Sequence, residues 1–204
     1  MEEASHVPSL SSVLSELRER LSVIEKLDSV TMAGNSEPSA HPDFRAIVEG
    51  VLELRESLGG KWVFNCLSNG SELDRPDVVR ALDSLDEAWI KLDCATDDMF
   101  FRMNRPLKRV ESVAKHIQRI SRLRKARIQT LVWNYPALPS LGNWNPENKE
   151  ALFKAYAELK PVEIHLTTVK RETAFPGLQQ VPYTEMENFA AELRKSGLEA
   201  RVFA

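Results

Sequence analysis

A short polar turn, Gly34-Asn35-Ser36-Glu37, follows an apolar segment that ends at Ala33. Its residues could bind a ligand, because glycine lets a ligand approach the backbone closely and the turn follows the end of a predicted strand. Pro38 then prevents the apolar segment from continuing as a strand. The alternative is a strand-to-helix turn with a solvated glutamate, and the turn alone supports both interpretations.

A second polar turn, Ser68-Asn69-Gly70-Ser71, follows the next apolar segment. Ser68 and Asn69 offer short polar groups that could contact a carboxylate or a ribose. The alternative is an Asn-Gly turn, which needs no ligand.

A third apolar segment ends in Lys91-Leu-Asp93. Lys91 and Asp93 lie on the same face of a strand, because side chains alternate with a period of two. They could contact a ligand, or they could form a buried or peripheral ion pair.

Two further residues could contribute to binding. Arg105 lies between Asn104 and Pro106 on a predicted loop, where its planar guanidinium could hold a phosphate or a carboxylate. The alternative is an ordinary surface arginine. His165 lies in a later apolar segment and could face the interior of the fold, although a hydrogen-bonded core histidine is the commoner outcome.

The cysteine content excludes several classes of site. Cys66 and Cys94 are the only two cysteines and form no C-x-x-C pair, so neither a disulfide framework nor a zinc or iron–sulfur ligand set is present, and no metal ligands are predicted. Two free thiols suit a reducing cytosol. The N-terminus lacks the apolar core of a signal peptide, and no run approaches the roughly 18 apolar residues of a membrane span. We therefore expect a cytoplasmic protein without membrane contact.

Apolar periodicity predicts an alternating series of strands and helices. The predicted strands are residues 29–33, 62–66, 88–93, 128–133, 162–169 and 198–203. The predicted helices are residues 10–24, 44–58, 78–85 and 107–123, one that begins at Pro146 with Asn145 as its cap, and one that begins at a Thr184–Glu187 capping box.

This alternation predicts parallel strands joined by helical crossovers, in one α/β domain that spans residues 1–204. The carboxyl ends of parallel strands meet at one edge of a sheet, which is where such folds bind ligands. The polar turns described above all follow predicted strands. The series opens on a helix, so its first strand is expected to be missing.

Residues Arg102–Arg127 carry ten lysines or arginines against one acid, Glu111. Such a basic segment could meet RNA phosphates. The alternative is a solvated helix face, and the aromatic residues that would stack on bases are absent from the segment.

The ordered motifs together resemble the radical S-adenosylmethionine superfamily, in particular its wyosine-type and related iron–sulfur oxidoreductase branch. The resemblance extends from about Ser29 to Phe203. It rests on Val30–Phe44 with its Gly-Asn-Ser-Glu-Pro turn, Leu67–Ser71, Ile90–Asp93, Asn104-Arg-Pro106, Ile128-Gln-Thr130 and Ile164–Thr167.

The resemblance implies a partial TIM-like (β/α) barrel whose cofactors are S-adenosylmethionine and a 4Fe–4S cluster. It implies oxidoreductase chemistry, in which S-adenosylmethionine is cleaved to a 5′-deoxyadenosyl radical that acts on an unknown substrate. The implied cofactor-binding residues are Gly34, Asn35, Ser36, Glu37, Ser68, Asn69 and Asp93, and the implied substrate-binding residues are Lys91, Arg105, Gln129 and His165.

The sequence also departs from the family pattern. The C-x-x-x-C-x-x-C loop that holds the cluster is expected just before the 10–24 helix and is absent, and Cys66 and Cys94 cannot replace it. Ser36 stands where the family has glycine. We therefore expect this chain alone to be inactive as a radical enzyme. The alternatives are a non-catalytic relative that binds a nucleotide or RNA, and an unrelated α/β enzyme with a phosphate ligand, which the lack of a glycine-rich loop disfavours.

Overall fold

The centre of the fold is a sheet of six parallel strands that follow one another in chain order. The computed structural model describes residues 7–34, 36–106, 110–170 and 176–204. The strands are β1 (Ser29–Met32), β2 (Val63–Ser68), β3 (Glu87–Lys91), β4 (Ala126–Val132), β5 (Ile164–Thr168) and β6 (Ala200–Phe203). The sheet is open, and the predicted partial TIM-like barrel is confirmed.

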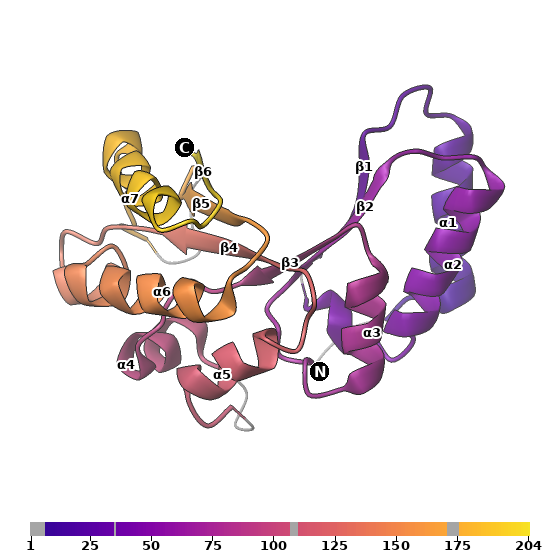
Figure 1. Ribbon diagram of the computed structural model, residues 1–204. Coiled ribbons are helices and arrows are strands. Elements are labelled where there is room, and N and C mark those ends of the chain that lie inside the picture. The colour runs from indigo at the N-terminus through magenta and orange to yellow at the C-terminus, as the bar shows by residue number, and fades with distance from the viewer. Residues whose placement is uncertain (1–6, 35, 107–109, 171–175) are drawn as a thin grey trace.

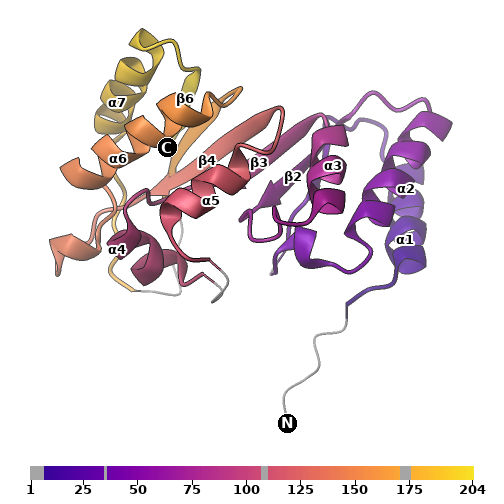
Figure 2. The ribbon, with the colours of Figure 1, turned by 60° about the horizontal axis from the view of Figure 1, so that its bottom comes forward.

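Helices connect the strands and line one side of the sheet, from α1 and α2 at one end to α7 at the other (Figures 1 and 2). The long helices are α1 (Leu10–Ser22), α2 (Phe44–Ser57), α3 (Pro76–Ser84), α5 (Val113–Ile120), α6 (Pro146–Leu159) and α7 (Tyr183–Lys195). The short helical turns are η1 (Pro38–Ala40), α4 (Asp97–Met99), the π-helical turn η2 (Phe100–Asn104) and η3 (Pro139–Leu141). Each strand therefore crosses to the next through a helix on the same side, as parallel pairing requires.

The two faces of the sheet differ in composition because side chains alternate along each strand. The face toward the helices is apolar and buried, and it joins the helices in one core cluster. The strand residues at this face include Phe64, Cys66, Ile90, Ile128, Ile164 and Leu166, each without exposed surface.

The opposite, concave face is largely polar and partly exposed. Strand register places Lys91, Gln129, His165 and Arg201 in one row across β3 to β6 on this face. Adjacent strands lie about 4.8 Å apart, so this row is roughly 14 Å long.

The helix ends differ in part from the sequence predictions. Asn145 caps α6 by accepting a hydrogen bond from the Asn148 amide, as predicted. The prediction of a Thr184–Glu187 capping box is wrong, because α7 already begins at Tyr183 and no side chain caps it. The predicted 107–123 helix is shorter, since α5 begins at Val113 behind a Ser112 cap, and residues 107–109 lie outside the described part of the chain. Among the described helices, none is long and apolar enough to cross a membrane.

Candidate functional site

A groove of about 470 Å³ lies at the carboxyl ends of β1 to β4. It brings together most of the residues that the sequence predicts for the cofactor site, and two of those predicted for substrate. Its lining comprises Ala33, Gly34, Ser36, Glu37, Pro38, Leu67, Ser68, Asn69, Trp89, Lys91 and Gln129.

Glu37 ties the turn after β1 to the turn after β2. Its Oε1 atom accepts hydrogen bonds from the Ser39 amide, the Ser39 hydroxyl and the Ser68 hydroxyl. Its Oε2 atom accepts a hydrogen bond from the Asn69 amide at 2.6 Å. A carboxylate offers about four acceptor positions, two on each oxygen. Oε1 is therefore fully used within the protein, and Oε2 is the atom with capacity left for a ligand.

Two glycines shape these turns. Gly70 has a φ of 72°, and its amide donates to the Ser68 hydroxyl, so the Asn-Gly turn positions the serine that holds Glu37. Gly34 differs, because a Cβ atom added there would meet nothing closer than the Ser36 carbonyl oxygen at 3.8 Å. Packing within the protein therefore leaves room for a larger side chain at position 34. Because the residue is glycine, that room remains part of the groove.

Lys91 and Asp93 form the predicted ion pair, with Lys91 Nζ 3.2 Å from Asp93 Oδ2. The Lys91 side chain is 43% exposed and lines the groove, whereas the Asp93 side chain is only 4% exposed and lies behind it. Burial raises the pKa of Asp93, against the opposing effects of Lys91 and of the Leu131 amide that donates to Oδ1. Lys91 is therefore the member of the pair that faces the groove, and Asp93 orients it.

Two buried asparagines that the sequence analysis missed hold the end of β3. Asn143 donates to the carbonyls of Asp93 and Leu131, and accepts from the Trp133 amide. Asn148 also donates to the Asp93 carbonyl and accepts from the Ala95 amide. Both lie about 50 positions from Asp93 in a region that reads as an ordinary loop and helix cap, so local sequence carries no signal for this brace.

His165 lies on the concave face beside the groove, which agrees with the prediction that it could face the interior of the fold. Its ring lies between those of Trp89 and Phe203, with centroid separations of 3.8 and 4.4 Å and ring planes tilted by 34° and 51°. Its Nε2 atom lies 3.2 Å from Glu163 Oε1. Partial burial lowers the pKa of His165, and the neighbouring Glu163 carboxylate opposes that shift. This histidine is therefore packed between two rings on the concave face.

Arg105 does not join this group. It is exposed, has a left-handed φ of 44° after the π-helical turn η2, and is absent from the lining of the groove. Asn35 lies outside the described residues.

Five of the ten cations in the basic segment pair with acids of the fold. Arg119 and Arg122 both pair with Asp74, and Arg124 pairs with Asp83. At its two ends, Arg102 pairs with Asp98 and Arg127 pairs with Glu163. This arrangement gives no support to the predicted RNA contact.

The two thiols do not fit an iron–sulfur cluster. Cys66 and Cys94 are both buried, and Cys66 points to the apolar face of the sheet. Burial raises the pKa of Cys66 to about 12 and raises that of Cys94 as well, whereas cluster ligands are thiolates. Within the described residues, no group of three or more histidine, cysteine or acidic side chains is placed to hold a metal ion.

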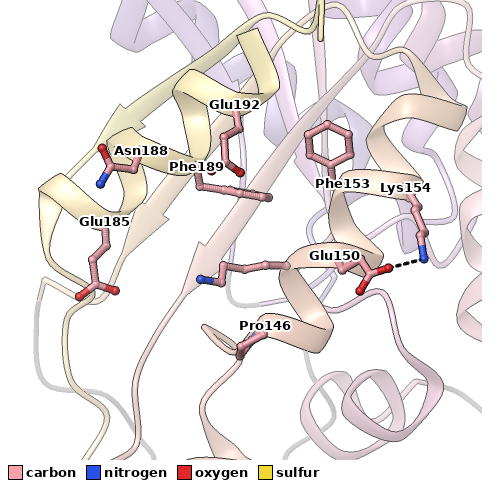
Figure 3. A pocket seen from close by; sticks show the side chains of 9 residues that line it. Pro146, Glu150, Phe153, Lys154, Glu185, Asn188, Phe189 and Glu192 are labelled. Carbon is pink, nitrogen blue, oxygen red and sulfur yellow. Dashed lines mark hydrogen bonds and ion pairs between the residues drawn. The ribbon is translucent and has the colours of Figure 1, made fainter. Parts of the chain in front are cut away.

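A second groove, of about 540 Å³, lies between α6 and α7 in the outer layer of helices. Figure 3 shows Phe153 and Phe189 projecting into it, with the Lys154–Glu150 ion pair at its rim. No strand end reaches this groove, and its charged residues are helix-surface lysines and glutamates. It lacks the convergence of loops that marks the groove at β1 to β4.

Comparison with known proteins identifies the fold. No protein-family model matches the chain. The UPF0026 protein slr1464 of Synechocystis sp. is 25% identical over 150 residues, which are 72% of this chain and 52% of that protein. The chain therefore spans about half the length of the curated relative it matches.

Several solved structures share the architecture. A domain of the pyruvate-formate lyase-activating enzyme from Bacteroides vulgatus superposes with a TM-score of 0.61 at 18% identity, over 87% of this chain and 99% of that chain. Streptococcus suis SuiB bound to precursor peptide SuiA gives a TM-score of 0.72 at 13% identity, over 100% of this chain and 44% of that chain. SuiB bound to S-adenosylmethionine gives 0.62 at 14% identity, over 86% and 39% of the two chains. Archaeal TYW1 gives 0.54 at 13% identity, over 91% and 60%. At these identities the likeness establishes the fold, a (β/α) partial barrel.

Proposed function

We propose that this chain is the S-adenosylmethionine-binding part of a radical S-adenosylmethionine-type oxidoreductase, with the groove at β1 to β4 as the cofactor site. The observation that carries the proposal is the Glu37 carboxylate. Three protein donors use up Oε1, and Oε2 keeps an acceptor position at a groove that Gly34 leaves open. An ammonium group is the ligand that best complements such an atom.

The remaining lining residues suit the other parts of that cofactor. Ser36 and the exposed Asn69 offer polar groups beside Glu37, and the Trp89 ring offers an apolar wall. Ser68 acts indirectly, since its hydroxyl is occupied by Glu37 and the Gly70 amide. The likeness to SuiB, which was solved with S-adenosylmethionine bound, supports the same assignment.

When bound in enzymes of this superfamily, S-adenosylmethionine supplies the adenosyl radical that removes a hydrogen atom from substrate. That reaction requires a 4Fe–4S cluster, and the thiols of these 204 residues do not fit one. The function proposed for this chain is therefore cofactor binding and positioning, within one domain. Its two free, buried thiols suit a reducing compartment, which supports a cytoplasmic location.

Calorimetric titration tests the proposal with two ligands, S-adenosylmethionine and 5′-methylthioadenosine. The second keeps the nucleoside but lacks the amino and carboxylate groups. We expect it to bind at least about tenfold more weakly, a difference of about 1.4 kcal/mol. Equal affinities would instead identify a nucleotide-binding module, and no binding of either ligand would overturn the proposal.

Glu37→Gln removes the charge from the atom proposed to meet the ammonium. It should weaken S-adenosylmethionine and leave 5′-methylthioadenosine unchanged, because only the first carries an amino group. Glu49→Gln is the matched control, since Glu49 lies on the surface of α2 and pairs with Arg45. A Glu37→Gln variant that loses both ligands equally would show a purely structural role for Glu37.

Anaerobic incubation with iron and sulfide tests the cluster separately. We expect no stoichiometric 4Fe–4S absorption band from this chain, because its thiols are too few and are held protonated by burial. A stable band would contradict the buried, protonated state of the two cysteines.

A further inference from the structure

The concave face carries a second binding surface beside the cofactor groove. Strand register places Lys91, Gln129, His165 and Arg201 in one row, and Phe203 lies one step nearer the carboxyl ends, beside His165. We define these five residues as the concave row. Lys91 and Gln129 also line the cofactor groove, so the two surfaces are continuous.

The charges of the concave row are arranged with the cations outward. The Arg201 side chain is 71% exposed, while its partner Glu163, 2.8 Å from Arg201 Nε, is only 12% exposed. Lys91 and Asp93 show the same order at the other end of the row. Each buried acid fixes its cation and leaves it facing solvent. A ligand that approaches this face therefore meets positive groups first, although the ion pairs sum to nearly zero charge.

Glu163 also anchors the interior of the row. Its Oε2 accepts a 2.5 Å hydrogen bond from Arg127, whose guanidinium lies 5.4 Å from the Trp89 ring centroid. Glu87 and Glu199 lie at or before the amino ends of β3 and β6, and Glu37 lies in the adjoining groove. The two exposed cations, Lys91 and Arg201, therefore mark the two ends of the row across β3 to β6.

Three aromatic rings accompany these cations. Trp89, His165 and Phe203 follow one another in contact, with ring planes tilted by 34° and 51°, and Phe203 is 42% exposed at the end of the series. Phe203 leaves apolar surface exposed beside Arg201, and a flat ligand would cover that surface. Packing alone explains the buried Trp89 but not an open phenylalanine face next to Arg201.

We infer that the concave row binds the substrate of the proposed enzyme, and that this substrate is a planar ring that carries an anionic group. The ring stacks on Phe203 and His165, and the anion meets Arg201 or Lys91 with Gln129 as a neutral hydrogen-bonding partner. A guanidinium matches a carboxylate or a phosphate in geometry. The inference rests on the proposed function only in naming this ligand the substrate, because the binding surface itself needs no cofactor.

Titration of the whole chain, followed by NMR, tests the inference with matched probes. Indole-3-acetate and indole-3-acetamide share a ring and differ in charge. Indoxyl 3-phosphate keeps the indole ring and carries a phosphate in place of the carboxylate. We expect at least one of the two anions to bind at least fivefold more tightly than the amide, with shifts at His165 and Phe203. The tighter anion identifies the group that the row accepts. Equal binding of all three probes, or of none, would overturn the inference.

Arg201→Gln should abolish the preference for the anion, and Phe203→Leu should weaken all ring probes. Lys154→Gln is the control, because it makes a matched charge change on the outer surface of α6 and should alter nothing. An unchanged preference in Arg201→Gln would overturn the assignment of the anion site.

These results are separable from the cofactor titrations. S-adenosylmethionine binding without binding of any anionic ring would remove only this inference. Anionic ring binding without S-adenosylmethionine binding would remove only the proposed function.

Discussion

The two faces of one sheet show how differently the same strands are used. On β4, Ile128 points to the helices and is fully buried, while its neighbour Gln129 points to the concave face and lines the groove. The same alternation separates Ile90 from Lys91 on β3 and Ile164 from His165 on β5. The helix face supplies stability through apolar burial, and the concave face can carry polar chemistry because it is not needed for the core.

Substitutions at two adjacent residues of β4 test most clearly whether the two faces differ in their contribution to stability. Ile128→Ala removes a fully buried side chain and should lower the free energy of unfolding by about 2–5 kcal/mol. Gln129→Ala, one residue away on the open face, should change it by no more than about 0.5 kcal/mol. Denaturant unfolding of both variants measures the difference. Comparable losses would show that the concave face is part of the core.

The brace at the end of β3 lies between these extremes, since it is polar but fully buried. Asn143→Ala removes its hydrogen bonds with Trp133 and Leu131 and one of those with Asp93, and should destabilise the fold by about 3 kcal/mol. Asn188→Ala, on the exposed surface of α7, is the matched control and should be nearly neutral. A neutral Asn143→Ala would mean that the brace does not position β3.

A buried histidine on the helix side, His116, extends the comparison to pH. His116 of α5 is 3% exposed on the helix side, and burial lowers its pKa from 6.5 to about 4, with Arg119 adding to the shift and a hydrogen bond to the Lys91 backbone opposing it. The unfolded chain therefore binds this proton first. The free energy of unfolding should fall as pH drops below about 6.5 and level off for this group below about 4, a loss on the order of 3 kcal/mol.

His116→Gln keeps a hydrogen-bond donor but cannot titrate in this range. Its unfolding free energy should lack that part of the pH dependence, measured by urea unfolding at pH 7 and pH 4. A variant with the same pH profile as the original chain would exclude His116 as its source.

Sequence alone predicted the fold, and it singled out several residues that line the groove at β1 to β4, because both depend on local patterns. The apolar strands and their polar turns give parallel pairing, which brings Glu37 and Ser68 together although 31 positions separate them. It did not predict the Asn143 brace or the contact of the Trp89, His165 and Phe203 rings, because these depend on how distant segments pack together. The sequence also did not predict that Arg105 lies away from the groove. Its position is set by the π-helical turn η2, which apolar periodicity does not reveal.

Titration of S-adenosylmethionine into Gly34→Ala tests the central claim most directly. A methyl group at Gly34 meets no protein atom closer than 3.8 Å, so the variant should be as stable as the original chain, or more stable by about 0.4–1 kcal/mol. The same methyl group enters the proposed cofactor groove and should weaken S-adenosylmethionine at least about tenfold, or about 1.4 kcal/mol. A stable Gly34→Ala variant that binds S-adenosylmethionine with unchanged affinity would contradict the cofactor site.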